Sequence, residues 1–130
     1  MLDGLLICAP WIDKILDGSK TWEIRGSNTY KEGRIGLIES GTGTIVGVAE
    51  LVGVVGPLSL KELSANRRKA GFDRDENLFR LPYKQTFAWV LQNPKRLRNP
   101  VHYNHPSGAV IWVNLKPSVE QEVLRQLGAI

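Results

Sequence analysis

Hydrophobic and polar positions along the first part of the chain predict a strand followed by a helix. Residues 5–9 form a short apolar run typical of a buried strand. Pro10 suits the first position of a helix, and apolar residues then recur at helical spacing as far as Leu16. Gly18 follows, a residue type favoured just past the end of a helix. We therefore predict a helix of about two turns that begins at Pro10 and stops at Gly18.

Residues 21–25 predict the next strand, because they alternate in polarity and include β-branched and aromatic side chains. Side chains on a strand point alternately to its two faces. Glu23 and Arg25 should therefore share one face, and Trp22 and Ile24 should share the other. This strand is expected to have one polar and one apolar face.

Later segments rich in β-branched and aromatic residues predict further strands at 33–39, 44–55, 86–91 and 109–115. The first two are joined by Ser-Gly-Thr-Gly, a turn sequence whose glycines can adopt positive φ, so we predict a hairpin there. Pro94 and Pro100 should confine the segment after the third strand to a loop or to a sheet edge.

Capping patterns predict two further helices. Residues 59–62 read Ser-Leu-Lys-Glu, which has the form of a capping box and starts a helix that ends near Gly71. This helix would carry the basic residues 67–69. A second capping-box pattern begins at Ser118 and starts a short amphipathic helix that continues through Leu127.

Short strands with two or three short helices predict a mainly β fold of the α+β class, arranged as a small closed or nearly closed barrel. The 130 residues are 42% hydrophobic and 23% charged, which predicts one folded domain over residues 1–130. The apolar runs fall short of the roughly 20 residues that cross a bilayer, and the N-terminus lacks a secretory pattern. We expect a cytoplasmic protein. Cys8 is the only cysteine, and we expect no metal and no cofactor.

The formal net charge of +4 is unevenly distributed. Residues 1–58 carry five basic and seven acidic side chains, whereas residues 59–130 carry twelve basic and six acidic ones. Two basic clusters in the second half could bind phosphate groups, or could equally be solvated surface. Their members are Arg67, Arg68, Lys69, Lys95, Arg96 and Arg98.

Residues 10–25 resemble the signature of the ASCH family, in which a short helix, a glycine and a lysine precede Glu-x-Arg. Segments 33–38 and 45–51 resemble the next two strands of that family. Segments 87–91, 100–103 and 108–112 are similar to a looser pattern shared with PUA-like domains. The resemblance covers most of residues 5–115.

The resemblance implies a PUA-like barrel with a cleft near the first helix that binds RNA or another nucleic acid. Some similar proteins remove the acyl group from N4-acetylcytidine, and at least one is reported to cleave RNA. In the amidohydrolase branch a lysine, a threonine three residues later and a distal glutamate act together. Lys20 matches that lysine, and Glu23 stands in place of the threonine. The distal carboxylate could be Asp73, Asp75 or Glu76.

Three charged side chains after the first helix could form a binding or catalytic site. Beside Glu23 and Arg25, Lys20 should stay charged, which suits phosphate or carbonyl binding better than nucleophilic attack. Glu23 could accept a hydrogen bond from a base, and Arg25 could bind a phosphate or a base edge. Trp11 and Tyr30 are candidates for base stacking. The alternative is a surface ion-pair set that only holds the strand in place.

Other residues have structural interpretations. Trp22, Trp89 and Trp112 should belong to the core, and His102 and His105 should be loop hydrogen-bonders rather than general acids. Three functional hypotheses remain: an RNA-binding or modified-base-binding module, a hydrolase that uses the same cleft (amidohydrolase or ribonuclease), and a protein-interaction adaptor.

Overall fold

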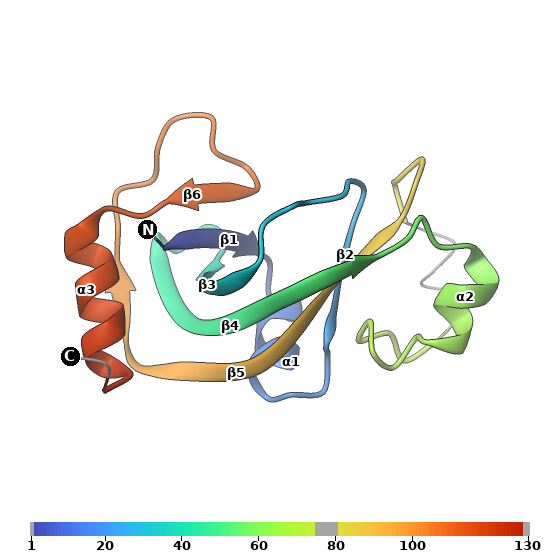
Figure 1. Ribbon diagram of the computed structural model, residues 1–130, viewed down its shortest axis with the longest axis horizontal. Helices are drawn as coiled ribbons and strands as arrows, with labels where there is room; N and C mark the ends of the chain where they lie inside the picture. The colour runs from blue at the N-terminus through green and yellow to red at the C-terminus, as the bar shows by residue number, and fades with distance from the viewer. Residues whose placement is uncertain (1, 75–80, 129–130) are drawn as a thin grey trace.

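The structure is a computed structural model that describes residues 2–74 and 81–128. The described residues form six strands and three short helices (Figure 1). In chain order they are β1 (Asp3–Ile7), α1 (Trp11–Leu16), β2 (Trp22–Arg25), β3 (Gly33–Glu39), β4 (Thr44–Val55), α2 (Leu60–Ala65), β5 (Phe87–His102), β6 (Trp112–Asn114) and α3 (Pro117–Gln126). None of the described helices is long and apolar enough to cross a membrane.

The six strands form one sheet in the order β2-β5-β4-β3-β1-β6. β1 and β3 are parallel, and every other neighbouring pair is antiparallel. β4 and β5 are the longest, with 12 and 16 residues, and they run together across the molecule in a curve (Figure 1). The sheet is therefore a curled half-barrel, and the mainly β, α+β class is confirmed.

The predicted hairpin joins β3 and β4. Gly41 and Gly43 have φ of +86° and +69°, which only glycine adopts without strain. The Thr42 hydroxyl donates to the Glu39 carbonyl at 2.8 Å and closes the turn. The helix stop at Gly18, with φ of +87°, is confirmed as well.

The tryptophans expected in the core lie there. Trp22 and Trp89 are buried, and Trp112 is half-buried and stacks on Trp89 with ring centroids 5.7 Å apart. Ile12 and Ile15 of α1 join the cluster around Trp89, so the apolar face of this helix packs on the sheet.

The ends of three predicted elements were wrong. β1 covers Asp3–Ile7 rather than 5–9, because its register is set by parallel pairing with β3. Cys8 therefore lies beyond the strand and is exposed. β6 is limited to Trp112–Asn114 because it pairs only with Asp3–Leu5 of β1. Pro10 precedes α1 as its N-cap and does not occupy its first turn.

The third predicted strand does not end at residue 91, because β5 continues through Pro94 and Pro100 to His102. Among the described strands it pairs beyond residue 91 only with β4, so this segment is a sheet edge, one of the two predicted alternatives. Its pairing with β4 shifts register between Val48 and Glu50 and again between Ile45 and Gly47. Each proline falls in one of these shifts, where it has no ladder partner and its missing N–H costs no hydrogen bond.

The second predicted helix is shorter than expected. α2 starts with the predicted capping box, in which Ser59 and Glu62 satisfy each other's backbone N–H groups. It ends at Ala65, because the Asn66 side chain bonds the Glu62 carbonyl and the backbone leaves the helical region. Residues 67–69 therefore lie in turns rather than on a helix.

The start of the terminal helix was misassigned too. α3 begins at Pro117, its N-cap is Lys116, and no side chain caps it. Ser118 lies inside the first turn and does not form the predicted capping box. Pro117 explains the start, because a proline is well tolerated where the backbone N–H has no helical partner.

Candidate functional site

The start of β2 is fixed by backbone hydrogen bonds from two directions. The Lys20 N–H donates to the Lys14 carbonyl of α1 at 3.0 Å. The N–H groups of Thr21 and Trp22 both donate to the Lys69 carbonyl, at 2.9 and 2.8 Å. The segment after α2 is thereby attached to the strand that carries the predicted site.

Lys20 is buried, with 3% of its surface exposed. Its ammonium group donates to the carbonyls of Trp22 and Ala70, both at 2.6 Å, and lies 3.6 Å from Oε1 of Glu23. Three protons thus face two carbonyl oxygens and one carboxylate, an arrangement suited to the charged form.

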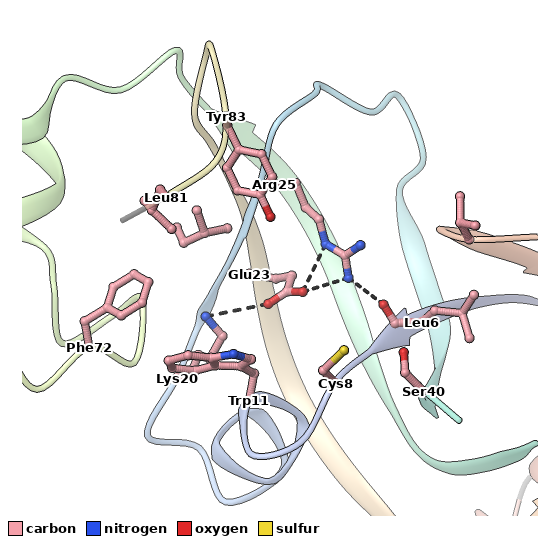
Figure 2. A pocket seen from close by; sticks show the side chains of 12 residues that line it. Leu6, Cys8, Trp11, Lys20, Glu23, Arg25, Ser40, Phe72, Leu81 and Tyr83 are labelled. Atoms are coloured by element: carbon pink, nitrogen blue, oxygen red, sulfur yellow. Dashed lines mark hydrogen bonds and ion pairs between the residues drawn. The ribbon is translucent and has the colours of Figure 1, made fainter. Parts of the chain in front are cut away.

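Glu23 links Lys20 to Arg25. Oε2 of Glu23 accepts from Nε of Arg25 at 3.0 Å and from Nη2 at 2.7 Å. Nη2 also donates to the Leu6 carbonyl of β1 at 2.6 Å, so the guanidinium bridges two strands. Figure 2 shows Lys20, Glu23 and Arg25 in a row, joined by these contacts.

This row lines a cavity of about 320 Å³, which we call the polar cavity. Cys8 and Ser40 add polar atoms to its lining, and Trp11, Phe72 and Tyr83 contribute aromatic rings (Figure 2). The predicted faces of β2 are confirmed, since Trp22 and Ile24 belong to an apolar cluster while Glu23 and Arg25 line the cavity. Ile24 also reaches the edge of the cavity.

Burial lowers the pKa of Lys20 to about 8, because an ammonium group loses hydration there. The carboxylate of Glu23 acts in the opposite direction and keeps this pKa from falling further. Since about 8 is above neutral pH, Lys20 carries its charge in most molecules at pH 7.

Two aromatic rings surround the Lys20 ammonium. Nζ lies 5.4 Å from the ring centre of Trp11 and 5.9 Å from that of Phe72. These two rings contact each other edge to face, with centroids 5.3 Å apart. Cation–π attraction therefore offsets part of the cost of burying the charge.

Comparison with known proteins identifies the family. The model of the ASCH domain family matches residues 5–101. The chain belongs to the ASCH domain family. No match was found among curated protein sequences.

Solved ASCH structures share the fold of this ASCH domain. The crystal structure of ASCH from Zymomonas mobilis superposes with a TM-score of 0.71 at 17% identity, covering 95% of this chain and 93% of that chain. A serine-to-alanine mutant of the Z. mobilis protein gives 0.70 at 18% identity, over 95% and 94% of the two chains. A tyrosine-to-phenylalanine mutant gives 0.69 at 18% identity, over 95% and 96%. At such identities the likeness shows the fold alone.

The ASCH fold brings some predicted site residues together and leaves others apart. Trp11 lines the polar cavity with Lys20, Glu23 and Arg25. Tyr30 does not line it and is 94% exposed, because the chain between β2 and β3 carries it out into solvent.

Only one of the three candidates for a third carboxylate, Asp73, is among the described residues. Asp73 is exposed and does not line the polar cavity. Asp75 and Glu76 lie outside the described residues. Among the residues that are described, no group of three or more His, Cys, Asp or Glu side chains could hold a metal ion.

The basic residues divide into two places. Residues 67–69 adjoin the cavity, because the Lys69 carbonyl binds the start of β2 and the Ala70 carbonyl binds Lys20. Residues 95–98 lie on β5, where Arg96 pairs with Asp13 at 3.3 Å and Arg98 lies near the end of α3.

His102 and His105 lie away from the polar cavity. The Tyr103 hydroxyl is 2.9 Å from Nδ1 of His105, and Nε2 of His105 is 2.9 Å from the Ala109 carbonyl. A carbonyl only accepts, so Nε2 of His105 donates to the Ala109 carbonyl. For His105 this geometry agrees with the predicted role as a loop hydrogen-bonder. The placement of His102 in the same loop was wrong, because His102 is the last residue of β5 and pairs with Thr44 of β4.

Sequence reasoning missed the cavity residues that come from outside the motif. Phe72 follows α2 by seven residues, and Tyr83 precedes β5 by four. Neither lies in a periodic segment, so the pattern of the chain held no signal for them. Cys8 follows the apolar run of β1, but a lone cysteine by type indicates no site.

Proposed function

We propose that this ASCH domain binds single-stranded RNA and takes one base or modified base into the polar cavity. The observation that carries the proposal is the carboxylate of Glu23, held between two cations in a cavity of about 320 Å³ with aromatic walls. A cavity of this size suits a base with part of its ribose.

Glu23 is suited to read the edge of a base. Arg25 occupies Oε2 with two donors, whereas the nearest described cation to Oε1 is Lys20 at 3.6 Å, beyond hydrogen-bond length. Oε1 therefore retains lone pairs for an amino or imino group of a base. Because Oε1 belongs to a charged carboxylate in a buried site, it favours bases that present a hydrogen-bond donor to it.

The cations that hold Glu23 are themselves held by the backbone. Lys20 donates to two carbonyls, and Arg25 donates to the Leu6 carbonyl. The ligand would thus meet a carboxylate already in place, which reduces the entropy lost on binding.

Phosphate contacts would come first from the basic residues next to the cavity. Arg68 and Lys69 are exposed, and their segment is hydrogen-bonded to β2 and to Lys20. Arg67 is half-buried, and Arg96 already pairs with Asp13. An RNA strand with one base in the cavity would pass residues 68–69 before it reached β5.

The proposal is tested with a fluorescein-labelled RNA decamer of mixed sequence, by fluorescence anisotropy at low salt. Glu23→Gln should weaken binding about tenfold or more, because the ligand loses a hydrogen bond to a charged acceptor. Glu122→Gln is the matched control, since it removes the same charge from an exposed pair with Arg125 on α3. The salt dependence should become less steep by roughly 0.7 per lost phosphate contact in Arg68→Ala and Lys69→Ala.

Two results would contradict this proposal. One is the absence of RNA binding by the unaltered protein at low salt. The other is a Glu23→Gln protein that stays folded and binds the decamer as tightly as the Glu122→Gln control.

A hydrolase in the same cavity is the second candidate, and the observation that favours it is the lowered pKa of Lys20, about 8. At pH 7 about a tenth of the molecules would hold a neutral amine there, which could act as a base or nucleophile. Mass spectrometry of N4-acetylcytidine and of RNA after incubation with the protein tests this. Turnover that is lost in Lys20→Met would support it, and unchanged substrates would reject it.

A further inference from the structure

Among the described aromatic rings that line the polar cavity, Tyr83 is the one without a cation–π or ring–ring contact to another described residue. The rings of Trp11 and Phe72 lie next to the Lys20 ammonium, and Trp11 also lies 5.2 Å from Nζ of Lys14. No cation and no second aromatic ring contacts the ring of Tyr83 within the described ranges. Tyr83 is 38% exposed and lines the polar cavity, so a ligand in the cavity can reach its side chain.

One side of the Tyr83 ring lies against Gly26, the residue that follows β2. A Cβ atom on residue 26 would lie 2.6 Å from Cδ1, 3.1 Å from Cγ and 3.3 Å from Cε1 of the ring. These distances leave no room for a side chain. The absence of a side chain on Gly26 thus allows the Tyr83 ring to lie close to the end of β2.

The two walls of the cavity enclose the carboxylate of Glu23. In Figure 2 Tyr83 lies on one side of Glu23, and Trp11 lies on the other. A planar group that reached Glu23 between these walls would lie against the Tyr83 ring. Base–aromatic stacking tolerates any base, so it complements the reading of one base edge by Glu23.

We infer that Tyr83 is the stacking surface for the bound base and that Gly26 positions it, an inference that rests on the proposed function. Trp11, the ring near the motif, would instead hold Lys20 in place. Tyr83 and Gly26 should therefore control the affinity for RNA without contributing to the electrostatic attraction of its phosphates.

Four variants test the inference with the same fluorescein-labelled RNA decamer. Tyr83→Ala should weaken binding by about 5- to 160-fold, the range that alanine substitution of a stacking ring gives. Tyr83→Phe should bind within about twofold of the unaltered protein, because stacking needs only the ring. Gly26→Ala should weaken binding by displacing the ring, and the double variant should be no weaker than Tyr83→Ala alone.

A matched control is available in the same sheet. Gly53→Ala adds a methyl group where no atom lies within 4 Å. It should bind as the unaltered protein does. The slope of log affinity against log salt should be unchanged in Tyr83→Ala, because no phosphate contact is lost, and thermal unfolding checks that each variant is folded.

The outcomes separate this inference from the proposed function. If Tyr83→Ala binds within twofold of the unaltered protein while Glu23→Gln fails to bind, the stacking role is overturned and the proposed function stands. If Tyr83→Ala weakens binding but Gly26→Ala does not, the positioning role of Gly26 is overturned. If the unaltered protein does not bind the decamer, both are overturned.

Discussion

The ammonium group of Lys20 lies among three acceptors in the interior of the protein. Two are carbonyl oxygens at 2.6 Å, and the third is the carboxylate of Glu23 at 3.6 Å. A buried charge is tolerated only when its donors are satisfied and a counter-charge is close. Lys20 meets both conditions. It therefore helps to hold Glu23 in position, and it is also a group that a ligand could contact.

Lys20 gives the stability of the protein a specific dependence on pH. The unfolded chain releases the Lys20 proton near the ordinary value of 10.5, whereas the folded protein releases it near 8. Between these values the unfolded state binds more protons, so the free energy of unfolding should rise with pH, by up to about 3 kcal/mol. Urea unfolding from pH 7.5 to 10.5 should show this rise in the unaltered protein and not in Lys20→Met.

The control for Lys20→Met is the same substitution at a lysine that is not buried. Lys116→Met, at an exposed position before α3, should keep the pH profile of the unaltered protein. Lys20→Met should also be less stable at pH 7, because Glu23 and two carbonyls lose a partner. Parallel pH profiles for the unaltered protein and Lys20→Met would contradict the lowered pKa.

Two helices with similar starting sequences begin in different ways. Ser59 caps α2 and accepts from the Glu62 N–H at 3.1 Å, and Oε1 of Glu62 accepts from the Ser59 N–H at 3.0 Å. Ser118, which has the same pattern, lies inside the first turn of α3 behind Pro117. The same short motif therefore caps one helix and leaves the other uncapped.

Alanine at each serine should distinguish the two cases. Ser59→Ala should lower the free energy of unfolding by about 1 kcal/mol, the usual contribution of an N-cap side chain. Ser118→Ala should change it by less than about 0.5 kcal/mol, as an ordinary surface substitution does. Urea unfolding of both variants measures the difference, and equal losses would show that the Ser59 cap contributes nothing particular.

At the level of the whole molecule, β4 and β5 hold the two ends of the fold together. Their pairing runs from Thr44 with His102 to Val55 with Ala88, and three register shifts bend it. One shift lies at Gly47, where α1 packs against the same surface. A Cβ atom there would lie 2.6 Å from the Lys95 carbonyl oxygen and would clash with Leu16.

Gly47→Ala should consequently destabilise the protein by about 2 kcal/mol or more, because backbone and core must both shift. Gly53→Ala, in the same strand with open space around it, should change stability by less than about 0.5 kcal/mol. Thermal and urea unfolding compare the two. A Gly47→Ala protein as stable as Gly53→Ala would show that the bend tolerates a side chain.

Short-range patterns along the chain were sufficient for much of this molecule. α1, its stop at Gly18, the β3–β4 hairpin and the alternation of β2 depend on neighbours within a few residues, whose hydrogen bonds and side-chain directions follow from spacing. Lys20, Glu23 and Arg25 share one stretch for the same reason. Their proximity could therefore be predicted without coordinates.

Contacts between distant segments set the rest. Ala70, fifty residues from Lys20, supplies one of its carbonyl acceptors, and Phe72 and Tyr83 complete the cavity from segments without periodicity. The length of β5 was mispredicted because its pairing with β4 overrides local preference. α2, in contrast, ends early for the local reason given by the bond of Asn66 to the Glu62 carbonyl. The energy of these contacts depends on which distant segments become neighbours in the folded sheet. Local patterns within one segment do not contain that information, so only the tertiary structure decides them.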